Sequence, residues 1–201
     1  MSARGPFVVL EGADGTGTTT QMHALAAHFR ARGRAVHTTC EPSTGPIGRE
    51  IRARLAAGVV DDDGWRALAL LFAADRLDHV AREIEPARHA GAIVISDRYA
   101  LSSLVYQSLH VDLAWVRALN AHAPAPDVTL VVTLPLDDAL ARIAARKGTE
   151  EIYDGRALQA RIHESYARLA RDVDGDLVDG KGSVDEVTAR LLAALAARGV
   201  A

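Results

Sequence analysis

A glycine-rich turn near the N-terminus, placed between a short apolar run and an amphipathic stretch, most constrains the fold. The run Phe7–Leu10 is typical of a buried strand, and residues 18 to about 32 have helical spacing. Gly12 and Gly17 have the separation of the P-loop pattern G-x-x-x-x-G-K-[ST], and Thr19 stands at its Ser/Thr position. A strand, loop and helix of this kind predict a phosphate site, because backbone N–H groups and the helix N-terminus attract an anion.

Thr18 occupies the position at which this pattern has a lysine. The lysine is a point charge that reaches the β- and γ-phosphates, whereas a threonine hydroxyl is neutral and shorter. Losing one preorganised electrostatic contact to a transition state typically costs on the order of 10²–10³ in rate. We therefore expect binding to tolerate this residue better than turnover, unless another cation fills the gap. The alternative for the loop alone is a Gly/Thr-rich turn without a ligand.

The rest of the chain alternates short apolar strands with amphipathic helices. Strands are expected at 7–10, 35–39, 93–95, 128–133 and 176–178, and helices at 18–32, 47–57, 65–88 with a bend near Pro86, 101–109, 112–121, 137–146, 157–172 and 184–198. This order predicts a single α/β domain over residues 1–201, with a parallel sheet covered by helices on both faces. Ligands of such sheets bind beyond the carboxyl ends of the strands. The loop Gly12–Thr19, Glu41-Pro42 and Asp97-Arg98 all follow strands and are expected to meet there.

Composition argues against several kinds of partner. The formal net charge is −3, whereas a general nucleic-acid binder is usually basic. No apolar run approaches membrane-spanning length, and residues 1–6 are too short and polar for a signal peptide. The only cysteine, Cys40, cannot form an intrachain disulfide. We therefore expect a cytoplasmic protein with no nucleic-acid or membrane partner.

Two further groups of residues suggest a ligand, and each has a simpler reading. Asp97 at a strand end can hold a metal-bound water, and Arg98 can make a bidentate contact with phosphate. The alternative is a surface ion pair. Phe72 and Arg76 lie one helical turn apart, so an aromatic ring and a cation can face the same base. The alternative for Phe72 is core packing.

Together, these segments resemble the thymidylate kinases, which convert dTMP to dTDP with ATP. Residues 7–21 are similar to the family's first strand and P-loop, except at Thr18. The most specific resemblance is to D-R-Y-x-x-S-S-x-A-Y-Q, which residues 97–107 match at most positions. Residues 70–76 are similar to the L-F-x-A-D-R helix, residues 41–52 to the R-E-P-G-G-T-x-x-G segment, and residues 126–130 to P-D-L-T-x. The resemblance implies a three-layer P-loop kinase fold with a five-stranded sheet, and a homodimer.

The resemblance also implies roles for individual residues. ATP and its phosphates would contact Gly12, Ala13, Asp14, Gly15, Thr16, Gly17, Thr18, Thr19, Thr20, Arg142 and Gly182. The nucleotide dTMP would contact Asp14, Glu41, Phe72, Arg76, Arg98, Ser102, Tyr106 and Gln107. Mg²⁺ would be held near Thr19 and Asp97, and the catalytic residues would be Asp14, Asp97, Arg98 and Arg146.

A short lid over ATP is expected at about residues 146–155, by the same resemblance. Cys40 stands where the family has the arginine of R-E-P, so this residue and Thr18 both remove positive charge near the phosphates. Arg146, Lys147 and Arg156 are the nearby cations that could compensate, and Arg146 is the best candidate among them. The alternative is that all three are solvated surface charges. The leading hypothesis is a working dTMP kinase. The alternatives are a nucleotide-binding homologue with little or no kinase activity, and a kinase for another nucleoside or nucleotide.

Overall fold

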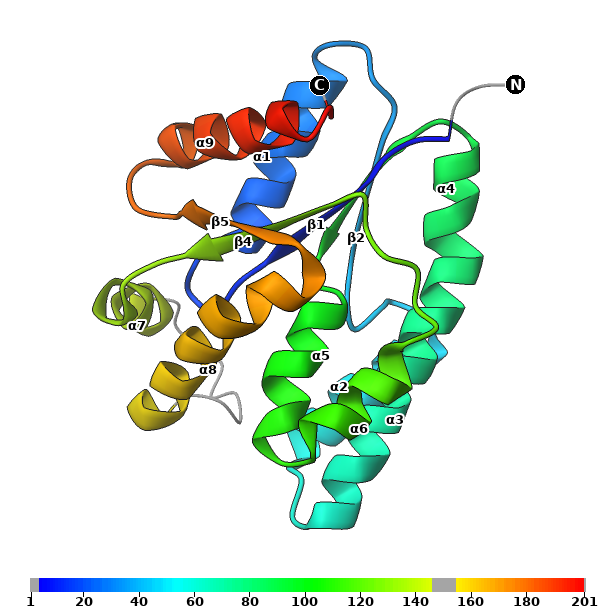
Figure 1. Ribbon diagram of the computed structural model, residues 1–201, viewed down its shortest axis with the longest axis vertical. Helices are drawn as coiled ribbons and strands as arrows, with labels where there is room; N and C mark the ends of the chain where they lie inside the picture. The colour runs from blue at the N-terminus through cyan, green and yellow to red at the C-terminus, as the bar shows by residue number, and fades with distance from the viewer. Residues whose placement is uncertain (1–3, 146–154, 201) are drawn as a thin grey trace.

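A parallel five-stranded sheet forms the centre of the protein, in the order β2-β3-β1-β4-β5 (Figure 1). The computed structural model describes residues 4–145 and 155–200. The strands are β1 (Phe7–Glu11), β2 (Val36–Cys40), β3 (Ile93–Asp97), β4 (Val128–Thr133) and β5 (Gly175–Asp179). Each lies where the apolar runs predict one. The central strand β1 pairs with β3 and β4, which brings Leu10 opposite Asp97 on one side.

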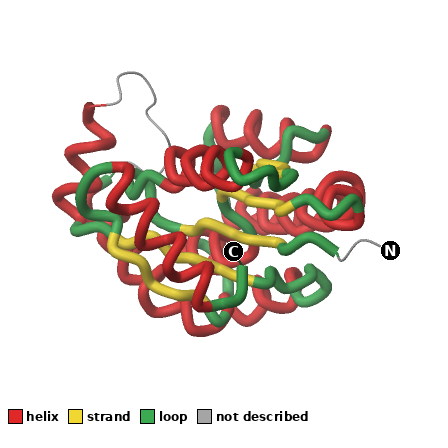
Figure 2. Tube along the Cα trace, turned by 90° about the horizontal axis from the view of Figure 1, so that it is seen from above, coloured by secondary structure: helices red, strands yellow, loops and turns green. Residues whose placement is uncertain are grey.

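Helices cover both faces of this sheet (Figures 1 and 2). On one face, α1 (Thr18–Arg30) packs beside α9 (Val184–Ala197), and the other face carries α5 (Ala100–Tyr106) and α8 (Arg156–Leu169). Alternate residues of β1 serve the two faces, because successive strand side chains point to opposite sides. Val8 and Leu10 join the core under α1 and α9, whereas Phe7 and Val9 join a core on the opposite face. The predicted three-layer α/β class is confirmed.

The remaining elements connect strands over the two faces. They are α2 (Pro46–Ala57), α3 (Asp62–His79), η1 (Val80–Ile84), α4 (Glu85–His89), η2 (Gln107–Leu109), α6 (Leu113–Asn120), α7 (Leu136–Ala145) and η3 (Ala170–Val173). The helices predicted to run to 109 and to 172 thus end in 3₁₀ turns, at η2 and η3. The last predicted residue of the helix 137–146 and almost all of the expected lid fall outside the described residues.

The single helix predicted over residues 65–88 is wrong in detail, because the structure divides it into α3, η1 and α4. It begins earlier, since the Asp61 carboxylate accepts a 2.7 Å hydrogen bond from the Gly64 N–H as an N-cap. Before Pro86 the backbone widens into a π-helical turn, in which the Glu85 N–H donates to the Val80 carbonyl. Proline has no N–H to donate, so an irregular turn at this point costs little.

Candidate active site

The loop after β1 brings its backbone close to neighbouring segments. Gly15 and Gly17 have φ values of 83° and 94°, in the left-handed region that favours glycine. A Cβ on Gly15 would lie 2.5 Å from the Ala139 carbonyl oxygen, so no larger residue fits there unchanged. The Thr16 hydroxyl closes the turn by donating a 2.7 Å hydrogen bond to the Ala13 carbonyl. Backbone shape therefore requires glycine at positions 15 and 17.

A cavity of about 350 Å³ opens over this loop. Of the residues predicted to contact ATP, the lining includes Ala13–Thr20, Arg142 and Gly182. The exception is Gly12, which is buried. Arg142 reaches the loop from α7, with Nη1 3.4 Å from the Thr16 carbonyl and Nη2 3.3 Å from the Gly180 carbonyl. Thr18 is 7% exposed and lines the cavity at the first residue of α1. Arg98 and Arg142 are the cations of this lining within the described part of the chain.

A second cavity of about 660 Å³ adjoins the first. Its lining includes all eight residues predicted to contact dTMP: Asp14, Glu41, Phe72, Arg76, Arg98, Ser102, Tyr106 and Gln107. Phe72 therefore faces a cavity together with Arg76, as their helical spacing predicts. Gln107 is 4% exposed, and its buried Oε1 has no hydrogen-bond partner among the described residues. Asp14 and Arg98 line both cavities, so the two spaces meet at this pair of side chains.

Arg98 is held at this junction by a strained backbone and several side chains. Its φ of 74° is uncommon for a residue with a Cβ. Its guanidinium pairs with Asp14 and donates to the hydroxyls of Tyr166 at 2.9 Å and Tyr106 at 3.2 Å. Burial alone would lower the pKa of Arg98, but the surrounding phenols and carboxylates raise it well above its ordinary value. A permanent, fixed cation therefore stands between the two cavities.

Behind Arg98 lies a buried carboxylate that sequence reasoning did not single out. Glu11, the last residue of β1, accepts hydrogen bonds from the Tyr99 N–H at 2.8 Å and the Ser102 hydroxyl at 2.6 Å. Burial raises the pKa of Glu11, although its hydrogen bonds from Ser102 and the charge of Arg98 oppose the shift. The signal in the sequence was a charged residue directly after the apolar run Phe7–Leu10. Tyr166 was missed as well, since its spacing on α8 is that of an ordinary core residue.

Asp97 and Thr19 lie together at the carboxyl end of the sheet, where the sequence predicts a metal. The Thr19 hydroxyl donates to Asp97 Oδ2, and the buried Oδ1 has no partner among the described residues. Mg²⁺ is usually held by one or two carboxylates, with substrate phosphates and water completing an octahedron. Within residues 4–145 and 155–200, no group of three acidic, histidine or cysteine side chains could hold a metal alone. The donor set therefore fits a phosphate-bound Mg²⁺ and not a metal held by protein alone.

The candidate compensating cations are only partly described. Arg146 and Lys147 lie outside the described residues. Arg156 pairs with Asp137 at 2.8 Å, with the two side chains 66% and 78% exposed, so its charge is engaged at the surface. Cys40 is partly buried, and burial raises the pKa of its thiol. Arg52, which sequence reasoning missed, lines the second cavity with Nη2 3.9 Å from the Cys40 sulfur.

Comparison with known proteins assigns the chain to a family. A profile described as thymidylate kinase matches residues 10–191. The chain belongs to the thymidylate kinase family. It is 40% identical over 189 residues to a probable thymidylate kinase of Pyrococcus abyssi, and this alignment covers 92% of each protein. It is 41% identical over 211 residues to a thymidylate kinase of Cereibacter sphaeroides, which covers 98% of this chain and 96% of the relative.

A third relative agrees with these two, and membership accounts for the fold. The chain is 42% identical over 202 residues to a thymidylate kinase of Rhizorhabdus wittichii, which covers 96% of this chain and 97% of the relative. The family match includes the phosphate loop, the segment after β2, the α3 residues and the segment after β3, which line the two cavities. Among the helices that the structure describes, none is both long and apolar enough to cross a bilayer.

Proposed function

We propose that this protein transfers the γ-phosphate of MgATP to dTMP, giving dTDP and ADP. The observation that carries the proposal is the junction at Asp14 and Arg98, which line both the phosphate-loop cavity and the larger cavity beside it. Transfer between two nucleotides requires that the donor and acceptor phosphates lie next to each other and in line. Two adjoining cavities with a fixed arginine between them supply that arrangement.

The larger cavity has the chemistry of a pyrimidine nucleotide site. Phe72 offers an aromatic face for the base, and Gln107 offers a carbonyl oxygen, without a partner among the described residues, for an N–H donor. The N3–H of thymine is such a donor. Arg98 would hold the dTMP phosphate bidentately, while Asp14 keeps the guanidinium turned toward the junction.

Phosphoryl transfer then depends on positioning and electrostatics. A dTMP phosphate oxygen attacks the γ-phosphorus, and the bond to the β,γ-bridging oxygen breaks, so ADP leaves with that oxygen. Thr19 and Asp97 would hold Mg²⁺, which when bound neutralises charge on the phosphates. Arg98 and Arg142 are the described cations beside the loop, so they would carry the electrostatic work of the missing lysine together with the predicted Arg146.

Thr18 favours a second candidate function. It lines the cavity with a neutral side chain at the first residue of α1, where the P-loop pattern places its charge. A protein of this kind would bind nucleotides through the backbone cradle and have little or no kinase activity. Gain of activity on introducing a lysine would distinguish a weakened kinase from a site that has been rebuilt around threonine.

We also propose a cytoplasmic homodimer that pairs through α3. Leu70 and Leu77 lie seven residues apart, on one face of this helix, and are 50% and 43% exposed. Two large apolar side chains on one helical face favour contact with a second copy. The lid expected at about residues 146–155 stays a prediction.

Turnover with dTMP is the deciding experiment. ADP release should be measured by a coupled assay with dTMP, ATP and excess Mg²⁺, alongside a panel of other nucleoside monophosphates. We expect turnover that is highest with dTMP, and a higher KM for dTMP in Phe72→Ala. Absence of turnover at high enzyme concentration, together with measurable dTMP binding, would support the nucleotide-binding alternative. Thr18→Lys is measured in parallel, and a large gain would identify a latent active site.

A further inference from the structure

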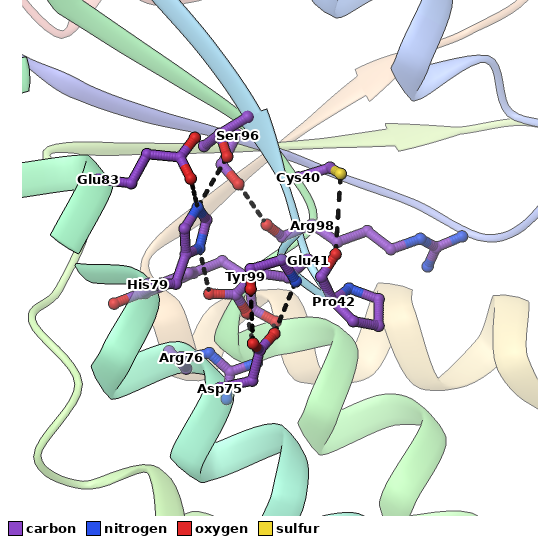
Figure 3. Close-up of polar contacts among 12 residues, drawn as sticks. Cys40, Glu41, Pro42, Asp75, Arg76, His79, Glu83, Ser96, Arg98 and Tyr99 are labelled. Atoms are coloured by element: carbon purple, nitrogen blue, oxygen red, sulfur yellow. Dashed lines mark hydrogen bonds and ion pairs between the residues drawn. The ribbon is translucent and has the colours of Figure 1, made fainter. Parts of the chain in front are cut away.

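A buried polar network joins helix α3 to the end of strand β2, around the carboxylate of Glu41 (Figure 3). Glu41 Oε2 lies 2.8 Å from Nη2 of Arg76, and Glu41 Oε1 lies 3.3 Å from Nδ1 of His79. The side chains of Glu41, Arg76 and His79 are 3%, 1% and 0% exposed. One carboxylate therefore bridges an arginine of the larger cavity and a histidine buried behind it.

The second nitrogen of His79 faces the opposite side of the network. Nε2 lies 2.7 Å from the Thr39 hydroxyl of β2 and 3.5 Å from a carboxylate oxygen of Glu83 on η1. Glu83 in turn contacts His37 Nε2 at 2.9 Å. Burial alone would raise the pKa of Glu83, but hydrogen bonds from Thr39 and His37 lower it below its ordinary value. Glu83 is therefore an ionised acceptor, and the ring of His79 lies between two carboxylates.

These contacts assign the proton on Nδ1. An ionised carboxylate can only accept hydrogen bonds, so Nδ1 must carry a proton to bond Glu41. The Thr39 hydroxyl donates its single proton to Glu83, so its oxygen accepts a hydrogen bond from Nε2. Both ring nitrogens of His79 therefore face hydrogen-bond acceptors, and the contact with Glu41 requires the proton on Nδ1.

We infer that His79 is a positioning residue for the nucleotide acceptor site, acting through Glu41 on Arg76. The inference rests on the proposed function, since its effect is read on dTMP. Arg76 also donates to the Ser103 hydroxyl at 2.9 Å and to the Tyr99 carbonyl at 3.1 Å. Both bonds leave from Nη2, the nitrogen that faces Glu41, while Nη1 donates to the side-chain carbonyl of Asn120. Glu41 supplies the only carboxylate that pairs with Arg76 in the described part of the chain. Without the Nδ1–H bond, the Glu41 carboxylate can rotate away from Nη2, and Arg76 is then positioned in the cavity lining by neutral acceptors alone.

Two amide variants separate the two ring nitrogens. The amide of asparagine reaches the position of Nδ1, whereas that of glutamine reaches the position of Nε2. We expect His79→Gln and His79→Leu to raise the KM for dTMP about tenfold to hundredfold, the range for losing a hydrogen bond to a charged group. His79→Asn should keep a KM for dTMP close to that of the wild type, and the KM for ATP should stay unchanged in all three. His89→Asn is the matched control, because the His89 side chain is 70% exposed.

A role in folding alone would give a different pattern. It would change the two KM values and the melting temperature together, and it would affect the asparagine and glutamine variants equally. Either pattern would overturn the inference, as would a wild-type KM for dTMP in His79→Leu.

Nitrogen-15 NMR of the wild-type protein provides a test that needs no variant. We expect His79 to show a protonated Nδ1, and a bare Nδ1 would overturn the inference. If the wild type neither binds nor phosphorylates dTMP, the proposed function fails while this test still decides the tautomer. The Nε–H signal of Arg76 reports how firmly the guanidinium is held. This signal should be retained in His79→Asn and broadened in His79→Gln.

Discussion

Replacing Glu41 with leucine breaks the buried Glu41–Arg76 ion pair and also removes the acceptor of the His79 Nδ1–H bond. The paired atoms are 2.8 Å apart and the side chains are 3% and 1% exposed. With an effective dielectric constant of about 20, their direct attraction is about 6 kcal/mol. Removing one partner leaves the other charge buried without compensation, which costs about 3–5 kcal/mol. For a protein of this size, that corresponds to a fall in melting temperature of about 6–20 °C.

An ion pair of nearly equal length provides the control. Glu50 and Arg54 are 2.7 Å apart on α2, but their side chains are 51% and 50% exposed. An exposed pair contributes only about 0.2–1 kcal/mol, so Glu50→Leu should have little effect on the free energy of unfolding. The two ion pairs match in chemical type and distance and differ in burial, and Glu41 has the His79 contact in addition.

The assay is urea unfolding at pH 7, followed by tryptophan fluorescence and circular dichroism at several protein concentrations. A double-mutant cycle with Arg76→Met should give a coupling energy of about 2 kcal/mol, because the double variant no longer buries a lone charge. The reasoning is refuted if Glu41→Leu destabilises the protein no more than Glu50→Leu. It is refuted equally if the effects of Glu41→Leu and Arg76→Met are additive.

Three other perturbations test separate parts of the structure. Burial raises the pKa of Glu11, so its contribution to the free energy of unfolding is complete below pH 4.5 and is lost as the pH rises through the folded-state pKa. In Glu11→Gln, the free energy of unfolding measured against pH should no longer show this loss. Gly15→Ala should destabilise the protein by about 1–3 kcal/mol and weaken ATP binding in calorimetry. The reason is that the φ of Gly15 is 83° and the new Cβ would lie 2.5 Å from the Ala139 carbonyl oxygen. An unchanged affinity for ATP would contradict this close approach of loop and α7. Leu77→Asp should shift the protein from dimer to monomer in analytical ultracentrifugation, whereas the wild-type mass in this variant would place the interface away from α3.

The strands and the order of the layers could be predicted because they depend on short-range patterns. Five β-branched or apolar runs, each bounded by turn residues or helical stretches, correspond to the five strands of the sheet. The parallel arrangement follows from the helices between them, since parallel strands need crossover connections. The division of residues 65–88 into α3, η1 and α4 was not predictable, because a π-helical turn has no clear signature in apolar spacing.

The sequence determined the phosphate loop, because glycine spacing between a strand and a helix has a direct backbone meaning. Most of the lining of the second cavity was predicted through the resemblance to the thymidylate kinases. Only the tertiary structure decided which of these residues touch one another. Arg98 meets Asp14, 84 residues away, and Tyr166, 68 residues away, because helices and strands remote in sequence pack together. The pairing of Glu41 with His79 was equally hidden, since neither position reveals the other by local spacing. Such contacts depend on the distances and angles between packed elements, and these are set by the whole core.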